Sequence, residues 1–472
     1  MRLRLRSLSR AYSVYLLIEC AYALFFGIYA TMTTVYRVVA AHLNPLQLVL
    51  VGTVLEGSIF LCQLPTGVLA DTVSRRLSVI LGVLLIGSGF LLEGSFTYFP
   101  TILCAQALWG IGYTFVSGAE EAWLADEIGT EAAGKAYLRA SQLGQGVGIA
   151  GIVISVALGS LRVNLPLLVA GGLFLALGAV LALIMPEGDF KRAGATPTHA
   201  SATESDGLAS ATPSEQPATS ATQPDRPTPV NWTGAFRQTL ARSWRLTRNS
   251  PILLTILGIT FIWGMSSEGF DRLSEAHMLL DIHLPMLGRF NTTVVWFGIF
   301  NLGATLLTIG VVEVILRRVN TNSHRSVARA LFAATAILTL SVVIFGLTGN
   351  FALALALYWL ITMIRGVSNP LYTAWVNQHT ESRVRATVLS LTGQADAFGQ
   401  IAGGPIVGAI GAFVALRAAI VTAGAALSPA LLLFARALGQ RQPEIQPPTS
   451  EEGEGAGEAD TETAETEAPT MP

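Results

Sequence analysis

Long apolar segments that recur along the whole chain constrain its fold more than any other feature. A helix needs about 20 consecutive apolar residues to cross the hydrocarbon core of a bilayer. Segments of this length lie at 11–34, 46–66, 77–97, 101–124, 137–160, 163–185, 252–278, 292–316, 328–348, 351–376, 386–411 and 415–435. Hydrophobic residues make up 51% of the chain and charged residues only 13%, which excludes an ordinary soluble domain. We therefore expect an all-α, polytopic membrane protein with twelve transmembrane helices.

The first apolar segment follows the basic stretch MRLRLRSLSR and resembles a signal peptide only superficially. It is too long for one, it contains Glu19, and no small-residue cleavage pattern follows it. The three cysteines, Cys20, Cys62 and Cys104, all lie inside apolar segments, so their spacing predicts neither a disulfide framework nor a metal site. We expect no metal and no cofactor.

The positions of lysine and arginine predict the orientation of the chain. If the N-terminus is cytoplasmic, 23 of the 29 Lys and Arg residues fall in cytoplasmic segments. Four fall outside, namely Arg37, Arg162, Arg289 and Arg417, and two fall within spans, namely Arg272 and Arg365. Cytoplasmic loops carry such an excess of positive charge in membrane proteins. We expect a multi-pass protein of the cytoplasmic (plasma) membrane with both termini in the cytoplasm, and the net charge of −2 gives no indication of nucleic-acid binding.

A polar tract divides the apolar segments into two sets of six. Residues 187–250 are rich in Ser, Thr, Ala and Pro and are expected to form a partly disordered cytoplasmic linker between residues 1–186 and 251–437. Within the linker, Trp232, Phe236, Leu240 and Trp244 are spaced four apart with arginines between them. This spacing predicts an interfacial amphipathic helix near 231–248, with an ordinary linker helix as the alternative. The acidic tail, 438–472, is expected to be disordered.

The two sets of segments resemble each other. At an offset of 252 residues, GIAGIVISVALG (148–159) aligns with QIAGGPIVGAIG (400–411) at six of twelve positions, and Ala122-Trp123 aligns with Ala374-Trp375. This predicts two six-helix pseudo-repeats, as in transporters whose two bundles rock around a central site. Small residues permit close helix contact, and the predicted helix-packing motif comprises Gly399, Gly403, Gly404, Pro405 and Gly408.

The stretch GVLADTVSRR, between the second and third apolar segments, resembles the signature loop of the major facilitator superfamily. Gly67, Leu69, Asp71, Arg75 and Arg76 match this signature, whereas Ser74 replaces the usual glycine. The resemblance implies a major facilitator fold and a gating motif that holds the inner side closed in the outward-facing state, against helix 11. It also implies an acid at the cytoplasmic end of helix 4, for which Asp126 fits and Glu127 is the alternative. The simpler interpretation is that Arg75 and Arg76 only fix the topology.

A second resemblance, to the drug:proton antiporter-like branch of that superfamily, is partial. QALWGIGYTF (106–115) has the spacing of the branch's helix 4 signature, but Gln106 replaces its arginine. GQGVGIAGIVIS has the glycines of the helix 5 signature and lacks its proline. GTEAAGKA (129–136) matches a phosphate-binding loop except that Ala136 replaces the Ser or Thr that binds magnesium. We assign it to the turn between helices 4 and 5 and expect an ion gradient, not ATP, to supply the energy.

Charged residues inside the spans are the candidates for proton coupling or for lining a substrate cavity, because such residues usually face the bundle interior. They are Glu19, Glu56, Glu120, Glu121, Glu268, Asp271, Arg272, Arg365 and Asp396. Acidic residues outnumber basic ones in this set, which favours the binding of protons and of cationic substrates. Glu268 and Arg272 are spaced at i and i+4, so the alternative to a functional role is that they form a structural ion pair with each other. Asp271 and Glu275 lie nearer the outer end, where water is accessible, and Glu93 is expected at the outer surface.

These features predict a secondary active transporter, a proton-coupled exporter that moves small amphipathic or cationic molecules by alternating access. Its partners would be the substrate, protons and the lipid bilayer, and we expect a monomer. A proton-coupled importer of a small nutrient is the first alternative, and a non-transporting sensor or scaffold is the second. The sequence has no nucleophile–base pair or metal-ligand cluster that would indicate an enzyme.

Overall fold

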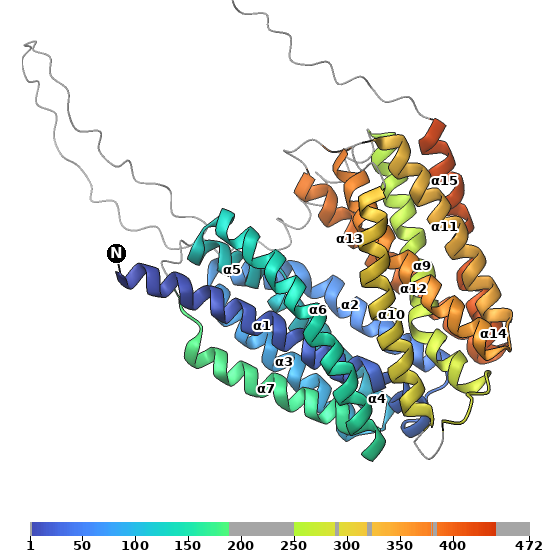
Figure 1. Cartoon of the computed structure of the whole chain (residues 1–472), viewed down its shortest axis with the longest axis horizontal. Helices are drawn as coiled ribbons and strands as arrows, with labels where there is room; N and C mark the ends of the chain where they lie inside the picture. The colour runs from blue at the N-terminus through green and yellow to red at the C-terminus, as the bar shows by residue number, and fades with distance from the viewer. Residues whose placement is uncertain are drawn as a thin grey trace, which may run out of the picture. The chain divides into compact units, whose positions relative to one another are not determined.

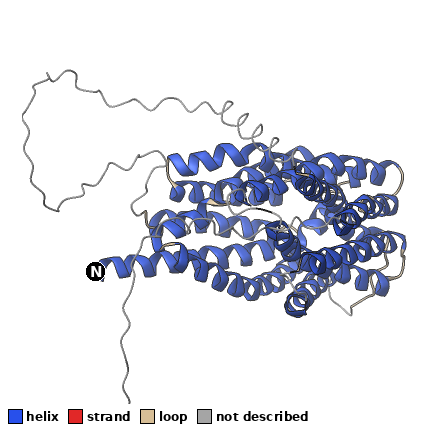
Figure 2. Ribbon diagram, turned by 90° about the horizontal axis from the view of Figure 1, so that it is seen from above, coloured by secondary structure: helices blue, strands red, loops and turns tan. Residues whose placement is uncertain are grey.

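A computed structural model of the chain describes residues 2–187, 250–287, 292–318, 323–378, 380 and 385–439. All regular structure in these ranges is helical (Figure 2). The elements labelled in Figure 1 and their neighbours are α1 (Arg2–Val35), the π-helix η1 (Tyr36–Ala40), α2 (Pro45–Thr72), α3 (Arg75–Ser95), α4 (Phe99–Val116), α5 (Ala119–Ile128), α6 (Thr130–Leu161), α7 (Leu165–Ile184), α9 (Pro251–Leu280), α10 (Thr292–Arg318), α11 (His324–Leu347), α12 (Phe351–Gln378), α13 (Arg385–Phe413), α14 (Leu416–Ala425) and α15 (Ser428–Gly439). The expected amphipathic helix near 231–248 and the acidic tail beyond residue 439 lie outside the described residues.

The described helices confirm the all-α, polytopic fold. Eleven candidate spans in the described ranges are long and apolar enough to cross a membrane. The twelfth expected span, 386–411, corresponds to α13, which has 29 residues but is not among the eleven. This helix carries the polar residues Gln394, Asp396 and Gln400 among its glycines.

Two expected spans are interrupted, which the apolar pattern did not predict. The span expected at 101–124 is divided into α4 and α5 at Ser117 and Gly118, and Gly118 has φ = 78°. Glycine adopts this left-handed conformation without a steric penalty, and the conformation ends an α-helix. The last span divides similarly between α14 and α15. The turn expected at 129–136 is reduced to Gly129, since α6 begins at Thr130.

The helices pack mainly within two groups, α1–α7 and α9–α15. In the first group α1 packs on α6, and α3 packs on α4 and α7; in the second, α9 packs on α13, and α11 packs on α12 and α14. Between the groups, α2 contacts α13 and α9, and α6 contacts α10. Trp123 and Trp375, which the 252-residue offset aligns, are both buried, each inside its own group.

The two groups share an apolar core at only one end. We call the end near Arg75 and Arg76 the inner end, since the charge bias predicts it to be cytoplasmic, and the opposite end the outer end. One buried cluster combines Val35 and Val49 with Phe270 and Phe297 at the outer end. The other two clusters each contain residues of one group only. In the inner half of the molecule a polar contact joins the two groups, since the Gln394 amide of α13 donates to the Gln63 side-chain oxygen of α2 at 2.9 Å.

Glycines allow α13 to approach α9 and α2 closely. A side chain at Gly399 or Gly403 would collide with the backbone of α9 near Met265. On the adjacent face, a side chain at Gly404 or Gly408 would crowd Val49 of α2. The stretch that contains Pro405 therefore packs against both groups of helices, beside the cavity described next.

Candidate functional site

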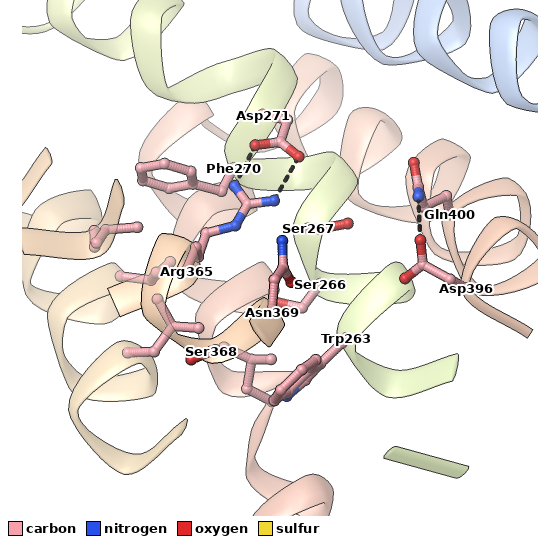
Figure 3. A pocket seen from close by; sticks show the side chains of 14 residues that line it. Trp263, Ser266, Ser267, Phe270, Asp271, Arg365, Ser368, Asn369, Asp396 and Gln400 are labelled. Carbon is pink, nitrogen blue, oxygen red and sulfur yellow. Dashed lines mark hydrogen bonds and ion pairs between the residues drawn. The ribbon is translucent and has the colours of Figure 1, made fainter. Parts of the chain in front are cut away.

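A cavity of about 220 Å³ lies among α9, α11, α12 and α13 (Figure 3). Its polar and aromatic lining consists of Trp263, Ser266, Ser267, Phe270, Asp271, Arg365, Ser368, Asn369, Asp396 and Gln400. A second cavity of about 420 Å³ shares Phe270, Asp271, Arg365 and Asn369 with the first and also contacts Glu275 and Tyr358. Ligand sites of drug-sized molecules typically have volumes of about 300–1,000 Å³, so the two cavities together provide space for a small organic molecule.

An ion pair between Asp271 of α9 and Arg365 of α12 stands where the two cavities meet. The guanidinium binds both carboxylate oxygens, with Nη2 at 2.8 Å from Oδ2 and Nη1 in contact with Oδ1 (Figure 3). The guanidinium carbon lies 6.0 Å from the ring centroid of Phe270. Such bidentate pairs are strong and fix the relative orientation of their partners. Asp271, expected to reach water near the outer end, is 40% exposed, and it is also held by an arginine on a neighbouring helix.

Asp396 of α13 contributes a second carboxylate to the smaller cavity. It accepts a hydrogen bond from Gln400 on its own helix at 2.8 Å, and no ion pair joins it to a described residue (Figure 3). Trp263 lies in the same cavity, and its indole Nε1 is buried with no hydrogen-bond acceptor among the described groups. The cavity therefore combines an uncompensated carboxylate, an aromatic ring and a free donor.

Glu275 lines the second cavity from α9. Its carboxylate lies 3.5 Å from the amide nitrogen of Asn301 and 3.4 Å from the hydroxyl of Tyr358, both potential donors. The sequence placed Glu275 near water at the outer end, but its side chain faces neighbouring helices. Counting the side chains of both cavities, three carboxylates face one guanidinium, Arg365.

Glu268 and Arg272 pair beside the cavity, at the contact between α9 and α2. Their i,i+4 spacing brings Arg272 Nε to 2.9 Å from Glu268 Oε1, and Glu268 is buried. A side chain at Gly52 of α2 would occupy the same space as this pair. Glu56, one turn further along α2, is close enough to interact electrostatically with Glu268 and Arg272. These three charges therefore lie between the two groups of helices.

Glu19, Glu120 and Glu121 belong to the other group of helices and do not line the two cavities. Glu19 of α1 accepts a hydrogen bond from Tyr15 at 3.1 Å. The adjacent acids of α5 point in different directions, so that Glu120 is buried and Glu121 is exposed.

The side chains of the GVLADTVSRR motif form a cluster at the inner end. Arg75 pairs with Asp126 of α5, lies 3.3 Å from Asp71, and donates to the carbonyl oxygen of Ala122 at 3.1 Å. Arg76 donates to the Ala182 carbonyl at 2.6 Å. Ser74 caps the start of α3 by accepting from the Leu77 backbone N–H at 3.0 Å, which fixes the turn. Leu69 is exposed, and a Cβ at Gly67 would meet open space.

Glu187, which the sequence analysis did not single out, also belongs to this cluster. Its carboxylate accepts a hydrogen bond from the Ser74 hydroxyl at 2.5 Å and lies 3.7 Å from Arg76. A carboxylate directly after an apolar segment, level with the basic pair, is the signal that would have indicated it. Among the described side chains, the ion pairs of the cluster all lie within the first group of helices. The gating role of the cluster remains a prediction.

The expectation that Glu93 lies at the outer surface is wrong. Glu93 is completely buried in α3 and pairs with Arg37 of η1 at 2.7 Å. It also accepts hydrogen bonds from the Tyr29 hydroxyl and the Gln106 amide, both at 2.6 Å. Arg37, counted among the outside residues, is only 4% exposed. Gln106 replaces the arginine of the helix 4 signature. It donates to the carboxylate of Glu93, which is paired with Arg37 from the end of the first span.

The family described as "Major Facilitator Superfamily" matches this chain over residues 14–404. The chain belongs to this superfamily. This membership makes transport across a membrane the function that its cavity must explain. The drug:proton antiporter branch is not distinguished by this match.

Individual relatives are distant. A protein of Bacillus subtilis (strain 168), named "Uncharacterized MFS-type transporter YxaM", is 27% identical over 157 residues, which cover 32% of this chain and 38% of that protein. The solved structure of a mutant of the nucleoside transporter NupG has a TM-score of 0.68 at 12% identity and covers 91% of this chain and 100% of its own. A POT family transporter in complex with a thioalcohol-conjugated peptide has a TM-score of 0.63 at 14% identity, with coverages of 92% and 97%. At these identities the two structures indicate the fold alone.

Proposed function

We propose that this transporter is a proton-coupled exporter of small cationic or amphipathic molecules, which binds its substrate in the paired cavities of α9, α12 and α13. The observation that supports the proposal best is the charge of the lining, where Asp271, Glu275 and Asp396 face a single guanidinium, that of Arg365. Because Asp271 is already neutralised by Arg365, a positively charged substrate would bind closest to Asp396.

The lining of the smaller cavity also suits a substrate with an apolar or aromatic part. Trp263 and Phe270 supply ring faces, on which a cation or a flat ring packs favourably. The unpaired indole N–H of Trp263 and the amide of Asn369 supply hydrogen-bond donors. A molecule with one positive charge, a ring and a few acceptor atoms would satisfy these groups together.

The direction of transport follows from competition for the carboxylates. A carboxyl group that binds either a proton or a cationic substrate, but not both, forces the two to cross the membrane in opposite directions. A proton gradient directed into the cell would then drive the substrate out. Asp396, which lines the smaller cavity, is the carboxyl group at which this competition would occur. Glu19 and Glu56 are the other proposed proton carriers, because like Asp396 they lie within the spans and no basic residue is adjacent to them in the sequence.

Proton coupling is tested by neutralising these acids one at a time, as Glu19→Gln, Glu56→Gln and Asp396→Asn. In everted vesicles, at least one variant should lose gradient-driven transport and retain exchange of substrate across the membrane. Glu131→Gln is the matched control, because the Glu131 side chain is 90% exposed on α6. Full proton-driven transport by all three variants would exclude these residues as carriers.

Uptake of a small polar solute is the second candidate function. The hydroxyls of Ser266, Ser267 and Ser368 and the amides of Asn369 and Gln400 make the cavity more polar than a site for purely hydrophobic molecules. Import with protons requires that substrate and proton bind at the same time. Substrate-driven proton entry in right-side-out vesicles would support import and contradict export.

A further inference from the structure

The short helix α5 connects a buried carboxyl group to the inner cluster. It contains ten residues and follows the left-handed Gly118, where a Cβ would meet no atom within 4 Å. Glu120 lies in its first turn and Asp126 in its last turn. Because Gly118 interrupts the helical hydrogen bonding between α4 and α5, rotation about this residue would move α5 as a unit.

Glu120 is buried without a partner for one of its carboxylate oxygens. Glu120 is only 6% exposed, and its Oε1 has no hydrogen-bond donor among the described groups. Ala119, Trp123 and Leu124 of the same helix belong to the surrounding apolar cluster. The hydroxyl of Tyr22, which interacts electrostatically with Glu120, is also buried without a partner.

The titratable groups around Glu120 provide no positive charge. Among the described residues they come from α1, α6 and α5 itself, and they are Tyr15, Glu19, Tyr22, Tyr137 and Glu121. The nearest cation of the inner cluster, Arg75 of α3, is directed to Asp126 and to the Ala122 carbonyl oxygen. An ionised, unpaired carboxylate in such surroundings is strongly destabilised, whereas a protonated carboxyl is tolerated.

The opposite end of α5 holds the inner cluster together. Asp126 pairs with Arg75, and the carbonyl oxygen of Ala122 accepts from the same guanidinium at 3.1 Å. The indole N–H of Trp123 donates to the carbonyl oxygen of Pro186 at 3.0 Å, after the end of α7. A displacement of α5 that carried Glu120 toward water would therefore disturb contacts with both α3 and α7.

We infer that Glu120 is a proton-binding residue whose protonation holds α5 in place and whose ionisation releases α5, and with it Asp126, from Arg75. This inference rests on the proposed proton coupling for its physiological meaning, but not for its test. It assigns to the first group of helices a proton site that is separate from the substrate cavity in the second group. The proton on Glu120 would thereby control the inner cluster directly.

Cysteine labelling measures the release of α5 without a substrate. Leu124, on α5, is completely buried, so a cysteine introduced as Leu124→Cys reacts only when α5 leaves its position. The native cysteines Cys20, Cys62 and Cys104 are replaced first. Labelling by a small maleimide in everted vesicles is divided at each pH by that of Glu131→Cys, an exposed reference, so that the titration of the thiol itself cancels. Below its midpoint, the ratio should rise by up to about tenfold per pH unit, as the ionised fraction of one carboxyl group does, and above the midpoint it should level off.

Three variants decide the assignment. Glu120→Gln, which cannot ionise, should keep the ratio low at all pH values, and Glu120→Asp should keep the rise with a displaced midpoint. Glu121→Gln, which removes the exposed neighbouring acid, should leave the profile unchanged. A flat profile in the parent protein, an unchanged profile in Glu120→Gln, or an unchanged midpoint in Glu120→Asp would overturn the inference. If labelling depends on Glu120 while transport proves independent of protons, the proposed coupling fails and the assignment of this site stands.

Discussion

Removal of one partner of the Arg37–Glu93 pair should destabilise the protein more than any surface substitution. Glu93 is 0% exposed and Arg37 is 4% exposed, so neither charge reaches water when the other is lost. Breaking a buried ion pair from one side typically costs about 3–5 kcal/mol, because an uncompensated charge remains. Glu93→Gln leaves the guanidinium unpaired, and Arg37→Met leaves the carboxylate with only the Tyr29 and Gln106 donors. We expect a loss in this range for each.

The double variant Arg37→Met/Glu93→Gln gives the sharper test. It removes both charges, and replacing a whole buried pair by uncharged groups is often nearly neutral. Its free energy of unfolding should therefore fall by less than that of either single variant. Thermal unfolding of the purified protein in detergent, followed by circular dichroism, provides the comparison, with Glu131→Gln as an exposed control. Losses below about 1 kcal/mol for both single variants, the range of surface pairs, or additive losses in the double variant, would refute this account of the network.

Three further changes have defined outcomes. The predicted gating role requires that Asp71→Asn raises the cytoplasmic labelling of a cysteine introduced at Gly393, an exposed position of α13. The rise should be at most about fivefold, since the 55% exposed Asp71 contributes at most about 1 kcal/mol. Unchanged labelling would leave the cluster a topological role only. Gly52→Val should abolish transport and weaken folding, because its side chain would enter the space of Glu268, whereas wild-type stability would contradict the tight contact. Deletion of about twenty residues from 194–229 should leave transport nearly intact, since loop length changes the free energy little; loss of transport at normal expression would indicate a binding segment.

Much of the fold could be predicted from the sequence because bilayer thickness sets the length of each apolar segment. The breaks within spans could not, since Gly118 resembles the many glycines that lie inside unbroken helices. The helix α13 illustrates the opposite case, because its length was predicted although it is not among the eleven candidate spans.

The candidate site was predicted as a set of residues and not as an arrangement. The sequence identified Asp271, Arg365 and Asp396 by the high cost of charges in a membrane, but the pairing of Asp271 with Arg365 joins helices that are far apart in sequence. Among these charged residues, only the contact between Glu268 and Arg272 could be predicted from the sequence, because they lie one turn apart on the same helix. The error at Glu93 arose because a charge near the end of a span can either reach water or pair inward, and the sequence does not distinguish the two.

The most direct test of the proposed function follows protons and substrate together in everted vesicles. The vesicle interior is acidified, a pH-sensitive dye is trapped in it, and small aromatic cations are added outside one at a time. The account predicts that a transported cation makes the interior less acidic, and that Asp396→Asn abolishes this response. A transported cation that leaves the internal pH unchanged, or that enters together with protons, would contradict proton-coupled export.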